Sequence, residues 1–264
     1  MLLKLADYYA LIFLLPFIVL HFFWRARHYA APAHWTLRAL VVTAVSVGIS
    51  MAVGIGWGMV LPGTSLVDGA ALGPVGGAVA GILVYEFAHY WYHRAAHSWN
   101  WLWRLGHQMH HSAESLDAFG AYYLHPIDAA LFTTWAVLVF YPLLGLTPAA
   151  GAIAAAFLAF NAAFQHANIR TPQWLGTIVQ RPESHAIHHG RGVHAWNYAD
   201  LPLWDMVFGT YRNPKPGEEP RSAGFYDGAS SRLGAMLAFH DVSEPAQRSA
   251  VKPAQGLQPG LGVR

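Results

Sequence analysis

The sequence predicts an all-α integral membrane protein with one compact, histidine-rich polar region. Of the 264 residues, 55% are hydrophobic and 11% are charged, whereas a soluble domain carries about 25% charged residues. Long apolar runs recur along the chain, and twelve of the sixteen histidines fall between positions 89 and 194. We therefore expect about three transmembrane helices and a helical hairpin, with the histidine-rich helical region on the cytoplasmic side.

The first two apolar runs are expected to be transmembrane helices. The run from Asp7 to Trp24 has roughly the length that spans a bilayer, and Pro16 is expected to kink it. The second run, 40–60, is rich in glycine and β-branched residues, which membrane helices tolerate.

A third run, 75–92, begins with the small residues GGAVAG, which suit close helix packing, and ends among histidines. Arg25, Arg27 and Arg38 lie between the first two runs, whereas the loop 61–73 has no Lys or Arg. Because cytoplasmic loops are enriched in basic residues, we expect the N-terminus outside and the histidine end of the third helix in the cytoplasm.

Two further runs, 129–146 and 149–164, are separated only by Thr147 and Pro148. Such a short connection predicts a helical hairpin with antiparallel, neighbouring arms whose ends return to one membrane face. His125 precedes this hairpin and His166 follows it, so both are expected on the face that carries the other clustered histidines. Whether the hairpin spans the membrane or is re-entrant stays open.

The chain is expected to have three parts. Residues 1–85 are predicted to form transmembrane helices, and 86–212 a catalytic domain that includes the membrane hairpin 129–164. Residues 213–264 are rich in Pro, Gly, Ser and Glu without a sustained apolar pattern, so a poorly ordered tail is expected there. Within it, 233–239 is expected to form one weak amphipathic turn on the membrane surface.

The histidines recur in motifs with metal-ligand spacing. His89, His93 and His97 are four residues apart, which places them along one helical face. An H-x-x-H-H pattern then occurs twice. Neutral imidazole binds iron, zinc and copper, and a single zinc site uses three or four ligands. Two metals are therefore expected for the eight main candidates, His93, His97, His107, His110, His111, His185, His188 and His189.

Composition limits the other functional classes. The chain has no cysteine, which excludes disulfides, cysteine-ligated zinc and iron–sulfur clusters within it. A formal charge of +2 without a basic run gives no indication of nucleic-acid binding. A zinc-dependent hydrolase is an alternative, although the H-E-x-x-H motif is missing. A metal-handling membrane protein is a second alternative, but a transporter would bury ionisable residues in mid-membrane.

Two irons held by neutral imidazoles at the membrane face would suit O2-dependent oxidation of a lipid. Oxidation of an unactivated carbon requires such a centre, because side-chain acid–base chemistry does not supply it. We therefore predict an oxidoreductase that hydroxylates or desaturates a sterol, a fatty acyl chain or a related membrane lipid. The sequence contains no haem-binding domain and no dinucleotide fingerprint, so a separate electron-donor protein or membrane redox carrier is expected.

The segments YWYHRAAH, HQMHHS, LHPID, HAIHH and NYADLPLWDMVFGTY resemble, in that order, the motifs of the fatty acid hydroxylase/sterol desaturase superfamily. The resemblance covers residues 86–212. It implies a non-haem di-iron, O2-dependent lipid oxidoreductase whose ligands are the eight histidines named above. Two departures are Ala199, where the family has glycine, and the additional His194.

Further histidines complete the candidate set. Eight ligands give four per iron and leave coordination positions free, so we predict that His166 is also a ligand. For His125, a ligand role and an outer role through Asp128 both stay open. His89 has a counterpart only in some family members. It is retained as a candidate, and the role of His194 is left open.

Overall fold

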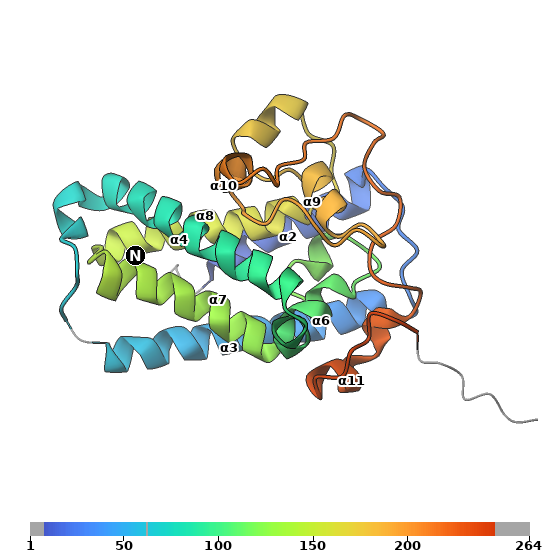
Figure 1. Ribbon diagram of the computed structural model, residues 1–264, viewed down its shortest axis with the longest axis horizontal. Coiled ribbons are helices and arrows are strands. Elements are labelled where there is room, and N and C mark those ends of the chain that lie inside the picture. The colour runs from blue at the N-terminus through green and yellow to red at the C-terminus, as the bar shows by residue number, and fades with distance from the viewer. Residues whose placement is uncertain (1–7, 62, 246–264) are drawn as a thin grey trace, which may run out of the picture.

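A computed structural model describes residues 8–61 and 63–245, and these residues are helical apart from loops and one isolated bridge between Gly190 and Ala223. Five long helices lie side by side along the longest axis of the molecule (Figure 1). They are α2 (Tyr9–Trp24), α3 (Trp35–Val60), α4 (Gly73–Ser98), α7 (Pro126–Leu138) and α8 (Pro148–Gln165). The all-α fold class is confirmed.

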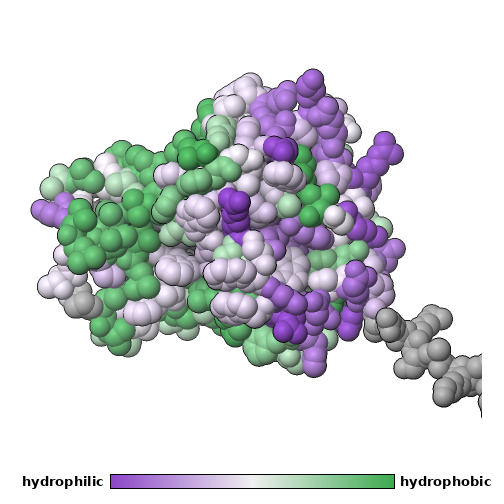
Figure 2. Space-filling model, in the orientation of Figure 1, coloured by the Kyte–Doolittle hydropathy of each residue, from purple (hydrophilic) through white to green (hydrophobic). Residues whose placement is uncertain are grey.

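Four segments are long and apolar enough to cross a membrane. Each has at least 18 residues, and they are Trp35–Val60, Gly69–Ser98, Pro126–Leu143 and Pro148–Gln165. Two of them include short non-α turns, namely the 3₁₀-helix η1 (Gly69–Leu72) and the π-helix η4 (Val139–Leu143). The described part of the first run, α2, is shorter at 16 residues. Figure 2 shows hydrophobic residues gathered at one end of the molecule and hydrophilic residues at the other.

Both arms of the predicted hairpin are present, and each begins with a capped proline turn. Thr147 accepts a hydrogen bond from the Ala150 amide at 3.2 Å, and Pro148 occupies the first turn of α8. His125 caps α7 in the same way, and Pro126 follows it. Proline suits the first helical turn because its missing N–H has no partner there in any case.

The expectation that the hairpin arms are packed neighbours is wrong. Helix α7 packs along α3, whereas α8 packs along α2 and α4. The small residues of α4 explain this arrangement, because a Cβ on Gly77 would lie 3.0 Å from the Ala150 Cβ. The absence of a side chain at Gly77 lets α4 and α8 approach closely, and α8 turns away from α7.

The hydrophilic end is built from short helices and loops. Its helical elements are α5 (Asn100–Leu102), η2 (Trp103–His107), α6 (Gln108–His111), η3 (Ala118–Gly120), η5 (Gln173–Thr177), α9 (Pro182–His188), α10 (Pro202–Val207), η6 (Ala229–Ser231) and α11 (Leu233–Leu237). In Figure 1, α6, α9 and α11 lie toward one end of the long-helix bundle, and α10 lies beside its middle.

Residues 214–245 do not follow the prediction of a poorly ordered tail. Met236 and Val242 are buried in a cluster with Trp35 and Met109. The Glu114 carboxylate accepts hydrogen bonds from backbone amides of this segment at 2.9 and 3.0 Å. A few widely spaced apolar residues are enough here, because they complete a core that the rest of the chain supplies. Residues 246–264, and Asp7 of the first predicted run, lie outside the described part of the chain.

Candidate metal centre

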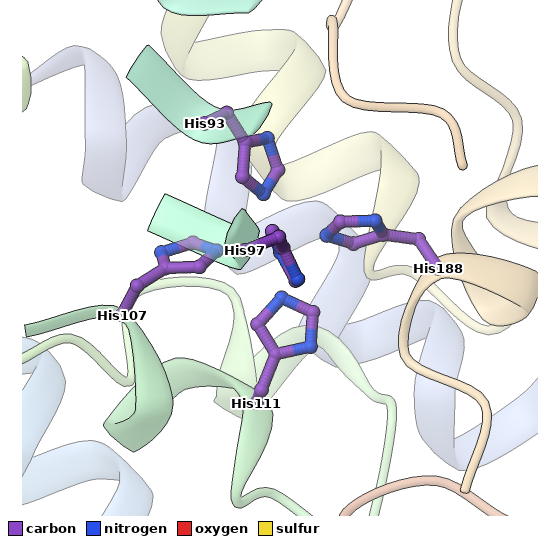
Figure 3. A group of neighbouring side chains, drawn as sticks. All are labelled: His93, His97, His107, His111 and His188. Atoms are coloured by element: carbon purple, nitrogen blue, oxygen red, sulfur yellow. The ribbon is translucent and has the colours of Figure 1, made fainter. Parts of the chain in front are cut away.

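Nine histidines form two adjoining groups at the hydrophilic end of the bundle. Within each group every residue offers one nitrogen, and these nitrogens all lie within 4.8 Å of one another. The first group, drawn in Figure 3, contains His93, His97, His107, His111 and His188. The second contains His110, His166, His185 and His189. Eight of the nine side chains are buried, and His97 is half-buried.

The H-x-x-H-H motifs each contribute to both groups. His107 and His111, four residues apart, face the first group, while His110 is turned toward the second. In the other motif the division is reversed, because His185 and His189 belong to the second group and His188 to the first. The two adjacent histidines of each motif point about 100° apart on a helix, so one motif contributes to both groups. The sequence predicted four histidines per metal, whereas the structure groups five and four.

The nitrogens that face each other in the first group have no hydrogen-bond partner. In the structure, the Nε2 atoms of His93, His97, His107, His111 and His188 are buried and unpartnered. Figure 3 shows their rings converging on a common centre. In the second group, Nδ1 of His110 and His185 and both nitrogens of His189 are buried without a partner, whereas the Nε2 atoms of His166 and His185 lie 3.1 Å from each other. Buried polar atoms are normally satisfied, so these nitrogens have the arrangement that metal ligands require.

Backbone carbonyls fix the ring orientation of three histidines. His93 Nδ1 lies 2.6 Å from the Tyr198 carbonyl oxygen, and His188 Nδ1 lies 2.7 Å from that of Trp196. His166 Nδ1 lies 2.8 Å from the Ala162 oxygen. Because a carbonyl oxygen can only accept, each Nδ1 carries the proton and each Nε2 keeps its lone pair. Such outer hydrogen bonds orient metal-ligating histidines.

Asp128 holds a fourth ring. Its carboxylate lies 3.0 Å from His107 Nδ1 and accepts a 2.7 Å hydrogen bond from the Tyr92 hydroxyl. Asp128 is fully buried in the first turn of α7. The close approach depends on Gly106, where a Cβ would lie 2.9 Å from the Asp128 Cβ. Gly106 belongs to η2, and single π-turns of this kind occur frequently at functional sites.

The segment after the second H-x-x-H-H motif supplies the carbonyl groups. Asp205 accepts hydrogen bonds from the Tyr198 and Ala199 amides, both at 2.8 Å. Trp196 and Asn197 have positive φ values of 70° and 52°, and the Asn197 side-chain amide donates to the Ser184 backbone carbonyl at 2.9 Å. These contacts hold the carbonyls of Trp196 and Tyr198 against the ligand rings.

Burial keeps the imidazoles neutral. It lowers the pKa of His166 to about 4. It lowers the pKa values of His110, His111, His185, His188 and His189 well below their usual range, and neighbouring histidines lower them further. A histidine must be unprotonated at its ligating nitrogen to bind a metal. At neutral pH these side chains are therefore in the form that binds.

Three candidate histidines lie outside both groups. His89 is one helical turn before His93 and stacks on it, with ring centroids 5.4 Å apart. His125 accepts a hydrogen bond from the Ile127 amide at 3.1 Å as the N-cap of α7, and its ring contacts Phe239. His194 Nδ1 lies 3.0 Å from His111 Nδ1, so it contacts a grouped histidine from outside.

Two further buried residues, Glu86 and Asp200, lie near the histidines, and no role was predicted for them from the sequence. Both are buried, and they form a third cluster with His89. One signal was present in the sequence, because Glu86 is the only charged residue in the otherwise apolar run 75–92. Ionisable residues within a membrane span are commonly functional. Asp200 carried no comparable signal.

A cavity of about 510 Å³ leads from the histidines into the bundle. Its walls come from α2, α3, α4, α7 and α8, with apolar residues such as Met51, Phe132 and Leu158. Histidines from both groups line it, namely His93, His107, His110, His166 and His185. The metal-binding candidates therefore face a largely apolar space between helices α7 and α8.

The family model for fatty acid hydroxylases matches residues 78–210. This range includes all nine grouped histidines. The chain belongs to the fatty acid hydroxylase family. The resemblance inferred from the histidine motifs is thereby confirmed.

Several characterised proteins are similar to this family member. Alkylglycerol monooxygenase of Homo sapiens is 37% identical over 134 residues, which are 48% of this chain and 28% of the relative. Ornithine lipid hydroxylase OlsE of Rhizobium tropici is 30% identical over 69% of this chain and 54% of its own length. Sphinganine C4-monooxygenase 1 of Arabidopsis thaliana is 26% identical over 56% and 58%.

These relatives are all named as hydroxylases or monooxygenases of lipids. The chain spans between 28% and 58% of their lengths, which is less than two thirds in each case. No solved structure matches the chain.

Proposed function

We propose that this protein is an O2-dependent, non-haem di-iron enzyme that oxidises a membrane lipid. The observation that carries the proposal is the pair of adjoining all-histidine groups opening onto an apolar cavity. Hydroxylation is favoured over desaturation, because the three relatives described above are named as hydroxylases or monooxygenases.

The nine grouped histidines would hold the two irons, five around one and four around the other. Imidazole ligands suit iron as well as zinc, copper and nickel, and the unpartnered nitrogens fit a ligand role. The oxidation of an unactivated carbon is the reason to propose iron. When bound, the irons would supply oxidation of an unactivated C–H bond with O2 and two electrons.

The protein's own side chains would position the ligands and the substrate. Asp128 and the carbonyls of Tyr198 and Trp196 hold ligand rings in the orientation that presents Nε2 inward. The apolar walls formed by α3, α7 and α8 would accept a hydrocarbon chain and exclude water. A lipid would enter from the bilayer, since these helices are the candidate membrane spans.

We further propose that the histidine groups face the cytoplasm and that the N-terminus is outside. The support is the arginine-rich segment between the first two helices, which lies at the hydrophilic end of the molecule. Arg27 in this segment forms an ion pair with Glu219 at 3.6 Å, and Arg38 donates to Ser230 at 2.9 Å. The two electrons would come from a separate electron-donor protein or a membrane redox carrier.

The test is a lipid oxidation assay with purified, iron-loaded protein and an artificial electron donor. Mass spectrometry should detect a lipid that gains one oxygen atom, and label from ¹⁸O2 should appear in it. Comparison of the membrane lipids of a deletion strain with wild type would identify the natural substrate. Hydrolysis that proceeds under argon in a zinc-loaded protein would instead support a zinc hydrolase. Metal binding without turnover on any lipid class would support a metal-handling role.

A further inference from the structure

Glu86, His89 and Asp200 form a buried polar cluster at the wall of the apolar cavity. One candidate ligand atom from each lies within 4.8 Å of the others. Glu86 is 0% exposed, and His89 and Asp200 are each 8% exposed. His89 and Asp200 both line the cavity. Two carboxyl groups and one imidazole are therefore gathered where most of the lining is hydrocarbon.

The cluster is rigidly held. Glu86 Oε2 accepts hydrogen bonds from the backbone amides of Asp200 and Leu201, at 2.8 and 3.2 Å. The Asp200 carboxylate accepts from Gln165 Nε2 at 3.0 Å, and the Asp200 carbonyl accepts from Asn161 at 2.8 Å. Even so, Glu86 Oε1 has no hydrogen-bond partner, and His89 Nδ1 lies 3.8 Å from Glu86 Oε2, which is too far for a hydrogen bond. The cluster thus keeps hydrogen-bonding capacity that the protein does not use.

Its location connects it to both histidine groups. Gln165, which holds the Asp200 carboxylate, directly precedes His166 of the second group. His89 stacks on His93 of the first group. A molecule in the cavity that touches Asp200 would therefore have its neighbouring atoms close to the proposed irons.

Other polar groups of the cavity wall are already engaged. The Thr133 and Ser50 hydroxyls donate to the Ala129 carbonyl at 3.0 and 3.5 Å. The Tyr122 hydroxyl donates to the Ala159 carbonyl at 3.3 Å. These three hydroxyls therefore already have acceptors within the protein, whereas the cluster offers carboxylate acceptors to an incoming polar group.

We propose that the Asp200 carboxylate, supported by Glu86 and His89, binds a hydroxyl or amine of the lipid substrate. The inference rests on the proposed function and specifies its substrate class, namely lipids with a hydrogen-bond donor near the oxidised carbon. The polar end lies inward beside the histidines, and the hydrocarbon chain extends between α3, α7 and α8. Gln165 satisfies the Asp200 carboxylate only in part. Covering its remaining acceptor capacity with hydrocarbon is unfavourable, so a substrate without a donor is selected against.

The test is anaerobic equilibrium binding to the metal-loaded protein, so that no turnover is involved. The probes are 1-O-hexadecylglycerol, which carries hydroxyls, hexadecylamine, which carries an amine, and 1-O-hexadecyl-2,3-di-O-methylglycerol, which has no donor. The variants are Asp200→Asn and Asp200→Ala, with Asp227→Asn as the control. Asp227 is a highly exposed aspartate paired with Arg191 on the surface. Metal content is measured for every variant.

Wild type should bind at least one donor-bearing probe more tightly than the methylated probe. Both Asp200 variants should weaken that binding about tenfold, the effect expected for a hydrogen bond to a charged group. They should leave the methylated probe and the metal content unchanged, and Asp227→Asn should match wild type. If the Asp200 variants lose affinity for 1-O-hexadecylglycerol, the site recognises a hydroxyl. If they lose affinity for hexadecylamine, it recognises an amine.

Equal binding of donor-bearing and methylated probes by wild type would overturn the inference without requiring any variant. So would an equal loss for all probes, or loss of metal from the Asp200 variants, which would assign the cluster to metal binding. If the binding pattern appears but no lipid is ever oxidised, the inference holds and the proposed function fails. If a lipid is oxidised and neither its binding nor its oxidation depends on Asp200, the proposed function holds and the inference about Asp200 fails.

Discussion

Asp128 lies outside the two histidine groups but contacts the ring of His107, a candidate metal ligand, and fixes its orientation. Replacing Asp128 with Asn keeps the side-chain volume but removes the negative charge from the partner of His107 Nδ1. Loss of such a partner typically lowers metal affinity 10–100-fold. Competition with a chelator should show faster iron loss from Asp128→Asn than from wild type, while Asp227→Asn should behave as wild type. Unchanged iron retention would mean that this carboxylate only packs.

His166 and His125 occupy the two ends of the predicted hairpin but have different surroundings. His166 lies in the second group, with Nε2 3.1 Å from His185 Nε2, so His166→Ala should lose about one iron per chain. His125 caps α7, so His125→Ala should keep both irons and destabilise the protein by about 1 kcal/mol. Iron analysis and thermal melting of the two variants distinguish these roles, and full iron occupancy in His166→Ala would contradict the assignment.

The sequence predicted most of the grouped histidines because their spacing on a helix is itself the signal. His166 was accessible only through the hairpin argument, which placed it on the correct side. The partition into five and four was not predictable, since it depends on how α6 and α9 face each other. Asp200 was missed because its importance comes from a contact with Glu86 114 residues away in the chain.

At the scale of elements, the π-helical turn η2 and the start of α7 are packed so closely that only glycine fits at position 106. A methyl group there would lie 2.9 Å from the Asp128 Cβ and 3.2 Å from its backbone nitrogen. We expect Gly106→Ala to reduce the stability by about 1–3 kcal/mol and to weaken iron retention by displacing Asp128.

Gly58→Ala provides the matched control, because Gly58 lies in α3 and a Cβ there would meet nothing within 4 Å. Since alanine favours helix more than glycine does, this variant should be at least as stable as wild type. Equal melting temperatures and iron retention for the two variants would show that the contact between η2 and α7 is not tightly constrained.

The positions of the helices in the sequence were easier to predict than which helices pack against each other. Apolar runs marked α3, α4, α7 and α8, although α4 continues to Ser98, six residues past the end of its run, because its last turns pack in the polar region. The hairpin arms were expected to pack together from their short connection alone. Helix packing depends on side-chain shape, and the glycines of α4 decided the partner of α8.

For the whole molecule, the orientation in the membrane is open to a direct test. The sequence contains no cysteine, so the single variants Asp68→Cys and Glu218→Cys each carry one thiol, both at exposed positions. A membrane-impermeant maleimide applied to intact cells should label Asp68→Cys and should label Glu218→Cys only after lysis. Labelling of both from the same side would refute the proposed topology.

Acid should destabilise the metal-free protein. The pKa values of His166 and His194 are lowered to about 4 by burial, whereas an unfolded histidine titrates near 6.5. Between these values the unfolded chain binds more protons than the folded one, so stability falls as the pH is lowered from about 6.5 to 4. The melting temperature of metal-free protein should therefore be lower at pH 5 than at pH 7.5, and an unchanged value would contradict the buried, neutral state of these histidines.

The fold class followed from composition and hydropathy, because the membrane requires long apolar helices. The C-terminal segment to residue 245 was not predicted, since its order comes from contacts with Trp35 and Met109 and not from its own pattern.

Metal analysis of the purified protein tests the central claim most directly. Cells are grown with adequate iron and zinc, and metals are measured per chain in wild type, His97→Ala and His185→Ala. We predict about two irons in wild type, with each variant losing iron mainly from its own group and distinguishable by Mössbauer spectroscopy. One zinc per chain with negligible iron in wild type would contradict the account.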